Sequence, residues 1–518
     1  MEAPAEVRWR RRWSLLALGC VALAYTSLVQ GAGSNQTGTY ALVKSLAQGT
    51  AIADRTRFEV GDAGTMDISW YHGHYYIAKA PGLAAASLPP YLVLRKLGMR
   101  TSGDPSTMLW ALGLWSVVLP ALVLLLLVRA LADQLEPGLG TAAAVILGLA
   151  TLLLPFGTML FVHSLSTALT FAAFALLWRE RRRGLSWASI VAAGLLAGVA
   201  VTVEYPLALV GVVLGGVAAA TSPHVRRAAV FFGAFAVGAS PALVYNHWAF
   251  GSATHFPYDD VVEVAGRSGH DTLLHYGAYS VSTPSFRGTM QLLFAEWGFV
   301  VTTPVLVAAA IGVVLMYRRG LRVEALAVGA VAALVPIYAS GVIRPYGDVA
   351  PGPRYLIPVL PFLCLGLVVA LRAWPLATLA LAAGSALLWV GVTATRPMQA
   401  WNGHVVDRLT SHDLAGYSPT ISELAGFSGP YRVAPFFLAV AAAVVCAVLA
   451  TPLRLTRAGL PAALAAVAAW LLVVHAAPRF DQFATNAAAL RAAAMPVVGA
   501  GAAAAVAILA GSARQPRR

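Results

Sequence analysis

Long apolar runs separated by short polar segments dominate the sequence. About fourteen of these runs are long enough to cross a bilayer as helices, since one span takes about 20 apolar residues. Their centres lie near residues 22, 120, 150, 170, 194, 213, 239, 307, 333, 364, 385, 443, 468 and 501. A transmembrane barrel would show short segments of alternating polarity instead. The pattern therefore predicts an all-α polytopic membrane protein with about 14 (12–14) transmembrane helices.

Composition agrees with a membrane protein and excludes a soluble one. Of the 518 residues, 59% are hydrophobic and 11% are charged, and the mean hydropathy is +0.72. Soluble domains are roughly 45–50% apolar even with glycine included. The cysteines Cys20, Cys364 and Cys446 each lie inside an apolar run, so neither a loop disulfide nor a metal knuckle is expected.

Arginines are concentrated in alternate loops. The formal net charge is +14, but the arginines lie at the ends of apolar runs, so we expect no nucleic-acid partner. With a cytoplasmic amino terminus every dense arginine group falls on one side, as the positive-inside rule requires. We therefore expect a multi-pass membrane protein with both termini cytoplasmic. The long loops then face outward: 31–109, 251–291, 343–354, 396–432 and 478–490.

The first outer loop, 31–109, is the most informative. Tyr40–Leu46 is predicted to form a short interfacial helix, and Leu83–Leu97 an amphipathic one with Pro89 and Pro90 near its middle. Paired prolines disfavour a straight transmembrane span there, so a segment along the membrane surface fits better. Between these helices lies an unusually polar stretch, DAGTMDISWYHGHYYIAKAPG.

Carboxylates in this loop are candidates for acid–base chemistry. Asp54, Asp62 and Asp67 are the catalytic candidates, and Glu59 lies between them. A carboxylate at the water–membrane boundary can accept the proton of a sugar hydroxyl within hydrogen-bond reach. The alternative is that individual members are solvated loop residues.

The same stretch holds a candidate phosphate contact and candidate substrate contacts. Only three of the 36 Lys and Arg residues are lysines, so Lys79 before Ala-Pro-Gly suggests a compact point charge for a phosphate, or else a lysine that reaches the membrane surface. His74, Tyr75 and Tyr76 are candidates for binding substrate, the tyrosines alternatively for an aromatic belt. His72 and His74 lack an apparent third ligand, so we expect no metal and no other cofactor.

Further polar residues lie at the outer ends of the predicted spans. Ionisable groups at membrane depth cost roughly 2.5–3.5 kcal/mol on insertion scales, so a set on one face suggests a functional site. His163, Glu204 and Asn246 are candidates for substrate contacts. Arg344 and Arg354 bracket the loop PYGDVAPGP, and the arginine fork suits a phosphate. For Arg354 the alternative is an anchor at the membrane surface.

Together these motifs resemble a known enzyme family. A first span, an outer loop with a polar cluster and Tyr-Tyr-x-x-Lys-x-Pro, and an amphipathic helix are similar to the integral-membrane glycosyltransferases of the GT-C type, notably bacterial aminoarabinose-transferase and protein-mannosyltransferase-like enzymes. The resemblance rests on SNQTGTYALVKSLAQGTAIAD, MDISWYHGHYYIAKAPG, EYP, YNHWAFG and GPRYLIPVLPFL. It predicts a GT-C-like catalytic module at residues 1–372 and further transmembrane helices at 373–518.

The resemblance implies an activity at the outer membrane face. Such enzymes transfer a sugar from a polyprenyl-phosphate donor to an acceptor, here a glycan, a lipid or a protein. A first-loop carboxylate would deprotonate the acceptor, and Lys79 matches the position of a phosphate-facing lysine in relatives. Many relatives carry an acidic residue just after the first span, where this chain has Ser34-Asn35-Gln36. Amides cannot act as general bases, so the base is assigned to Asp67, with Asp62 and Asp54 behind it.

Two other functions compete with this prediction. A transporter or flippase for a lipid or glycan should carry charged residues or broken helices near mid-membrane, whereas the ionisable residues here collect in loops and at helix ends. A non-catalytic protein descended from a GT-C enzyme is the third reading, and the amides at Asn35 and Gln36 keep it open.

Overall fold

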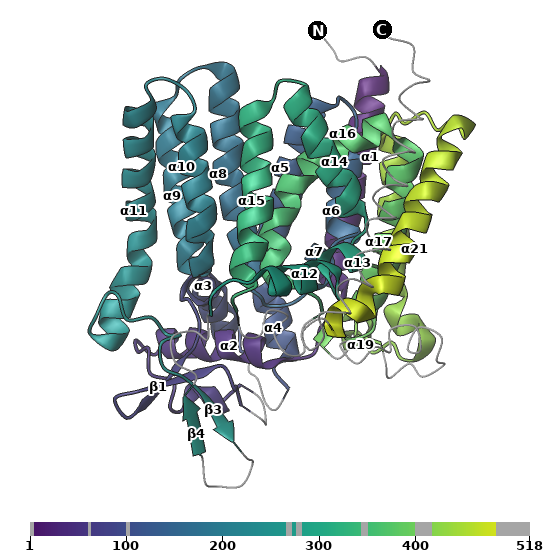
Figure 1. Ribbon diagram of the computed structural model, residues 1–518. Coiled ribbons are helices and arrows are strands. Elements are labelled where there is room, and N and C mark those ends of the chain that lie inside the picture. The colour runs from purple at the N-terminus through teal and green to yellow at the C-terminus, as the bar shows by residue number, and fades with distance from the viewer. Residues whose placement is uncertain are drawn as a thin grey trace.

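The chain folds into a bundle of helices with one small β-sheet at one end (Figure 1). The structure is a computed structural model, and it describes residues 5–60, 64–99, 104–265, 272–275, 282–342, 351–398 and 417–482. The bundle consists of α1 (Ala5–Ser27), α5 (Leu119–Leu135), α6 (Gly140–Leu149), α8 (His163–Arg183), α9 (Trp187–Val203), α10 (Ala208–Ala219), α11 (His224–Phe250), α14 (Val305–Arg318), α15 (Arg322–Ala339), α16 (Leu360–Ala373), α17 (Pro375–Ala394), α20 (Ala434–Ala450) and α21 (Leu460–Gln482).

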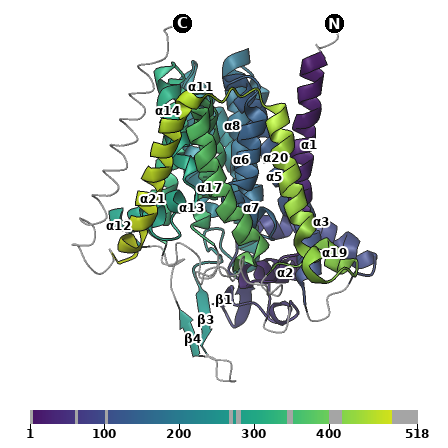
Figure 2. The same cartoon turned by 90° about the vertical axis from the view of Figure 1, so that its right-hand side faces the viewer.

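Shorter elements gather at the end of the bundle where α1 ends, which we call the loop end (Figures 1 and 2). They are α2 (Ser34–Ala47), η1 (Thr56–Phe58), α3 (Gly82–Lys96), α4 (Ser106–Gly113), α7 (Leu153–Gly157), η3 (Tyr205–Leu207), α12 (Phe286–Phe294), α13 (Phe299–Thr302), η5 (Arg354–Val359), α19 (Ile421–Leu424) and η8 (Gly429–Val433). A π-helical turn, η2 (Leu114–Val118), joins α4 to α5, and η9 (Arg457–Gly459) precedes α21 at the other end.

The helical membrane class is confirmed, whereas the number of spans stays a prediction. Among the described residues, seven helical stretches are long and apolar enough to cross a membrane, and the pair α12–α13 and α14, bent by 93°, would make an eighth. Three of the expected spans appear as helices too short for the full hydrocarbon thickness, at Gly140–Leu149, Trp187–Val203 and Tyr205–Ala219. The span expected near residue 501 lies outside the described residues.

Arginines mark the end of the bundle opposite the loops, which we call the arginine end. Here Glu136 pairs with Arg319 and Arg372, and Glu324 pairs with Arg181. The chain alternates between the ends, so the arginine-bearing loops fall together, as the charge pattern predicts. Which end faces the cytoplasm stays a prediction.

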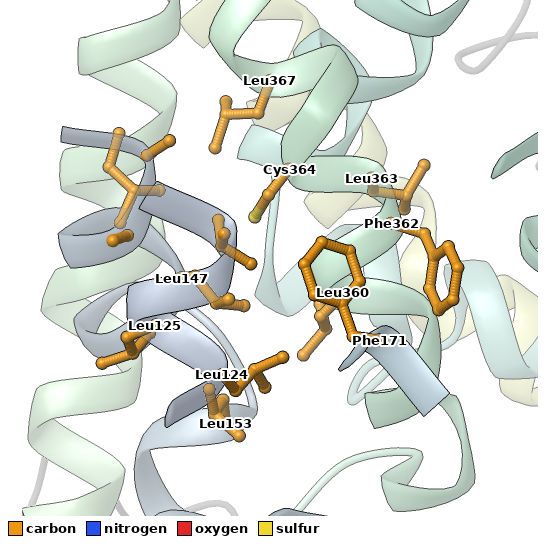
Figure 3. Packing of buried hydrophobic residues seen from close by; sticks show 14 of the residues in the cluster. Leu124, Leu125, Leu147, Leu153, Phe171, Leu360, Phe362, Leu363, Cys364 and Leu367 are labelled. Carbon is orange, nitrogen blue, oxygen red and sulfur yellow. The ribbon is translucent and has the colours of Figure 1, made fainter. Parts of the chain in front are cut away.

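Helices in the bundle pack by close fit, because lipid is as apolar as the side chains and burial alone gives little driving force. Leu124 of α5, Leu147 of α6, and Phe171 and Phe362 of α8 and α16 interlock in one cluster (Figure 3). Where α14 crosses α16, a Cβ on Gly312 would come within 1.8 Å of the carbonyl oxygen of Gly366. Only glycine permits that crossing. Helix α20, from the predicted C-terminal module, packs along α1 (Figure 2).

The first outer loop forms the two helices that the sequence predicts: α2 is longer than the predicted Tyr40–Leu46, and α3 is shifted by one residue from Leu83–Leu97. Helix α2 starts at Ser34 and lies across the loop end (Figure 1). Helix α3 continues through Pro89 and Pro90. Their placement at the membrane surface stays a prediction.

A four-stranded antiparallel sheet, which the sequence did not predict, ties two outer loops together. Its order is β2 (His74–Ile77), β1 (Ile68–Tyr71), β3 (Val261–Ala265) and β4 (Thr272–His275). Strand β1 pairs with β2 in a hairpin and with β3 on its other side, where Ile68 lies opposite Val262. The sheet therefore joins loop 31–109 to loop 251–291.

Candidate active site

The β1–β2 hairpin brings Asp67 and Lys79 together. Its two-residue turn has φ values of 48° at His72 and 86° at Gly73, and two left-handed residues suit the twist of a tight hairpin. The ladder continues past Ile68 and Ile77, because the N–H of Ala78 donates to the carbonyl of Asp67 at 3.1 Å. The next side chain along, Lys79, places its Nζ 2.7 Å from Asp67 Oδ2. The candidate base, Asp67, and the candidate phosphate contact, Lys79, therefore form an ion pair.

Helix α2 packs against the segment that carries Asp67. The N–H of Asp67 donates to Thr65 Oγ1 at 3.3 Å, and that hydroxyl donates to the carbonyl of Ser34 at 2.9 Å. Ser34 Oγ accepts from the N–H of Met66 at 2.8 Å. Gly38 of α2 faces the same spot, since a Cβ there would lie 3.2 Å from Asp67 Cβ. The first turns of α2 are therefore held directly against the segment that carries Asp67.

Asp54 occupies the other end of the hairpin. Its carboxylate accepts from the N–H of Tyr75 at 2.6 Å and lies 2.7 Å from Nδ1 of His74. Asp67 lies opposite Ala78 in the ladder, whereas Asp54 contacts Tyr75, three positions earlier on the same strand. The two carboxylates are therefore separated by roughly 10 Å along the strand. The structure therefore does not bring Asp54 together with Asp67, and Asp54 orders the hairpin.

The two tyrosines of the hairpin differ in environment. Tyr75 is half-buried, with the guanidinium of Arg57 3.7 Å from its ring centroid. Tyr76 is buried beside Phe250, at 4.8 Å between ring centroids. Burial raises the pKa of Tyr76, and the charge of Asp54 raises it further. Tyr76 therefore stays a neutral packing group near physiological pH.

His163 and Glu204 form a second charge cluster where α8 begins and α9 ends. Nδ1 of His163 lies 3.3 Å from Glu204 Oε2, and the hydroxyl of Ser166 donates to the same oxygen at 2.8 Å. Both partners of the His–Glu pair are buried. The ring of His163 lies between aromatic side chains, with Phe161 and Tyr355 each 6.2 Å away between centroids.

Arg354 lies beside this cluster. Its guanidinium is 5.6 Å from the ring centroid of Phe161 and 5.3 Å from that of Tyr355. Those are the same two rings that flank His163, so Arg354 and His163 share one aromatic setting. Arg344 and Asp62, the remaining predicted phosphate contact and carboxylate, lie outside the described residues.

Asn246 has partners within the chain at both ends of its amide. Its Oδ1 accepts from the hydroxyl of Tyr205 at 3.4 Å, and its Nδ2 donates to the carbonyl of Ala253 at 3.3 Å. It is fully buried. In this structure Asn246 fixes the start of loop 251–291 to the turn after α9.

Tyr258, which the sequence analysis did not single out, joins the two charge clusters. Burial raises its pKa well above the ordinary value, and the neighbouring Tyr205, Tyr355 and Asp67 act in the same direction. A hydrogen bond with the backbone of Ala80 acts against them. Tyr258 therefore lies near both Asp67 and the His163 setting. Its one sequence signal is the stretch FPYDD in an outer loop that no motif marked as important.

A close backbone contact also links the clusters. A Cβ on Gly82 would lie 2.7 Å from the carbonyl oxygen of Thr202. Gly82 is three residues after Lys79, and Thr202 is two residues before Glu204.

Among the described residues, no three His, Cys, Asp or Glu side chains gather as a metal site.

Comparison with known proteins gives similarity in fold alone. No family model matches the sequence, and no curated protein sequence matches it. ArnT from Cupriavidus metallidurans in the apo state is 15% identical, with a TM-score of 0.47 over 98% of this chain and 77% of that one. ArnT bound to undecaprenyl phosphate is 16% identical, with a TM-score of 0.44 over 97% and 77%.

A third solved structure is more distant. The Archaeoglobus fulgidus oligosaccharyltransferase in the apo form is 12% identical, with a TM-score of 0.40 over 85% of this chain and 56% of that one. These three likenesses, each with a TM-score below 0.5, concern the fold alone. They assign no substrate and no catalytic residue.

Proposed function

We propose that the protein is a membrane glycosyltransferase that moves a sugar from a polyprenyl-phosphate donor to a hydroxyl acceptor at the loop end. The observation that carries the proposal is the ion pair between Asp67 and Lys79. It places a proton acceptor and a compact cation side by side, next to the outer ends of helices. Transfer from a lipid phosphate needs both groups at that boundary.

The two residues would have complementary roles. The acceptor oxygen attacks the anomeric carbon while its proton passes to Asp67, and the bond from that carbon to the phosphate oxygen breaks. Negative charge then builds on the departing phosphate, where a preorganised cation at a water-poor site is most effective. Lys79 would supply that cation, and Arg354 a second one.

The ion pair also suggests an order of events. While the site is empty, each partner neutralises the other, which a partly buried charge requires. An arriving phosphate would draw Lys79 away from the carboxylate. Asp67 would then become available as a base only once donor is present.

The setting of Asp67 supports its assignment as the base. Many relatives carry an acidic residue just after the first span, where this chain has Ser34-Asn35-Gln36, and Ser34 at the start of that region hydrogen-bonds to Thr65 and Met66 just before Asp67. A carboxylate from the adjacent segment therefore reaches the region that the missing acid would occupy. This weighs against a non-catalytic descendant.

The loop end would face the outside of a bacterial plasma membrane, with the arginine end in the cytoplasm. The acceptor would be a glycan, a lipid or a protein that presents a hydroxyl there. The transporter alternative gains no support from the charged residues, because the described ion pairs in the bundle lie at the arginine end or the loop end.

The test uses purified protein in lipid nanodiscs with polyprenyl-phosphate sugar donors of several sugars. Wild type should release polyprenyl phosphate and form a glycosylated product, and Asp67→Asn should abolish both while expression and thermal stability persist. Glu59→Gln is the matched control, because it removes an acid that pairs with Lys44 in the same loop. Near-wild-type transfer by purified Asp67→Asn would contradict the base assignment. Substrate movement across sealed vesicles without product would favour the transporter.

A further inference from the structure

The start of helix α8 combines four kinds of group that bind anions. The first is its backbone: the N–H of Ser166 donates to the carbonyl of Val162 at 3.0 Å, while the N–H groups of His163, Ser164 and Leu165 have no acceptor within the helix. The helix dipole adds positive potential at this end. Such a terminus favours a phosphate, but by itself it does not define a site.

Two buried hydroxyls provide the second, independent observation. Ser164 and Thr167 are fully buried, and neither Ser164 Oγ nor Thr167 Oγ1 has a hydrogen-bond partner among the described residues. They are three residues apart, so they lie on one side of the first turns of α8. A buried hydroxyl without a partner costs about 1–3 kcal/mol, and two together indicate that a ligand completes them.

His163 is the third group. Its Nδ1 faces Glu204 Oε2 at 3.3 Å, and no described residue forms a hydrogen bond with its Nε2. A carboxylate facing Nδ1 orients the imidazole, which leaves Nε2 available to a ligand. The Ser166 hydroxyl holds Glu204 in place at 2.8 Å.

Arg354 is the fourth group, a guanidinium against the same two rings, Phe161 and Tyr355, that flank His163. Among the described residues, the titratable and charged groups around His163 are therefore Glu204, Arg354 and Tyr355, with Tyr338 of α15 close enough to interact with Glu204 and Tyr355. In this part of the chain the hydrogen-bond donors and the guanidinium of Arg354 outnumber the carboxylate of Glu204.

We propose that the start of α8 is a phosphate site, in which the hydroxyls of Ser164 and Thr167 donate to phosphate oxygens and Nε2 of His163 forms a hydrogen bond with the same phosphate, beside Arg354. The ligand is a phosphate monoester or a free phosphate ion. The identification with a lipid phosphate rests on the function proposed above, whereas the anion site does not. It would hold the leaving group after it departs from Lys79.

The experiment measures equilibrium binding to the full chain in nanodiscs. The probes are inorganic phosphate, polyprenyl phosphate and the uncharged polyprenol of the same length. His163→Gln should weaken binding of polyprenyl phosphate by roughly tenfold, as loss of a charged hydrogen bond predicts. His255→Gln, which removes another His–Asp pair at the loop end, is the matched control and should stay within about twofold of wild type.

Ser164→Ala separates ligand binding from folding. Because its hydroxyl has no partner among the described residues, the variant should unfold at the same temperature as wild type or a higher one, yet bind phosphate several-fold more weakly. Unchanged phosphate affinity in both Ser164→Ala and His163→Gln would overturn the site, even if sugar transfer proceeds. Binding of inorganic phosphate but not of polyprenyl phosphate, with loss in His163→Gln, would support the site and contradict the proposed donor.

Discussion

The ammonium of Lys79 lies 2.7 Å from the carboxylate of Asp67 at the open end of one hairpin, where Asp67 precedes the first strand and Lys79 follows the second. Twelve positions separate the residues in sequence, and strand pairing alone closes the gap between them. For the proposed roles this ion pair is a resting state. A carboxylate paired with Lys79 is not free to accept a proton, and an ammonium paired with Asp67 is not free to bind a phosphate. The arrangement predicts that the effects of changing the two residues will differ in kind.

Lys79→Ala should impair use of the donor more than use of the acceptor. The variant removes the cation that would face the phosphate and leaves the base in place, so KM for the donor should rise about tenfold or more. KM for the acceptor should stay within about twofold. Steady-state kinetics with each substrate varied in turn measure both values. Equal losses would indicate a folding role, and Lys44→Ala, which breaks the pair with Glu59 in the same loop, controls for loss of a lysine.

Gly38→Ala should slow transfer, with a net loss of stability of at most about 2–3 kcal/mol. A Cβ there would lie 3.2 Å from Asp67 Cβ and from Thr65 Oγ1, so the base must move by a few tenths of an ångström. Overpacking costs about 1–3 kcal/mol, and the better helix propensity of alanine returns up to about 1 kcal/mol. We expect kcat to fall about tenfold, since a displacement of 1 Å can cost a hundredfold.

Gly233→Ala is the matched control for that change. It adds the same methyl group inside helix α11, where nothing lies within 4 Å, so neither activity nor stability should fall. Wild-type kcat in Gly38→Ala would show that Asp67 tolerates displacement and is not the base.

The helices were predictable from sequence because apolar run length determines them directly. The chain from α14 to α17 follows the predicted spans near 307, 333, 364 and 385. Boundaries of short helices were harder, and the run around residue 150 divides into α6 and α7. A run of apolar residues shows that a segment is buried, but it does not show how one helix breaks into two.

The candidate site was only partly predictable, for a physical reason. Asp67 and Lys79 share one hairpin, so a local motif could identify both. Tyr258 reaches them through a strand pairing between β1 and β3, which joins positions nearly 200 residues apart. Long-range pairing of this kind leaves no local pattern. No local sequence pattern predicts the hydrogen bonds of Asn246 with Tyr205 and Ala253 either.

Glu59 should make stability depend on pH at the acidic end. A hydrogen bond from Lys44 lowers the pKa of Glu59 below its ordinary value, with Arg55 adding to the effect and burial opposing it. A lowered pKa in the folded state means that the contribution to stability is present above about pH 4.5 and is lost as pH falls through the folded value. Glu59→Gln should therefore unfold more easily than wild type at pH 7, by about 0.5–1 kcal/mol.

That difference should disappear in acid. Below the lowered pKa of Glu59 the wild-type carboxyl is protonated and resembles the amide. Thermal unfolding of both proteins in detergent at pH 7 and at a pH below that lowered pKa measures the two differences. A constant difference at both pH values would show that the variant acts through packing instead of charge.

Arg227 and Glu180 form a buried pair at the arginine end whose loss should be severe when only one partner is removed. Arg227 donates to both carboxylate oxygens at 2.6 Å and to the carbonyl of Ala218 at 2.7 Å. Arg227→Met leaves an uncompensated buried charge and should cost about 3–5 kcal/mol, whereas Arg227→Met with Glu180→Leu should recover most of it. Unfolding by heat or denaturant in mixed micelles measures both. Arg181→Met, which breaks the less deeply buried pair with Glu324, should cost less than Arg227→Met. A double variant as unstable as the single one would mean that the pair fixes the helices by geometry that apolar side chains cannot replace.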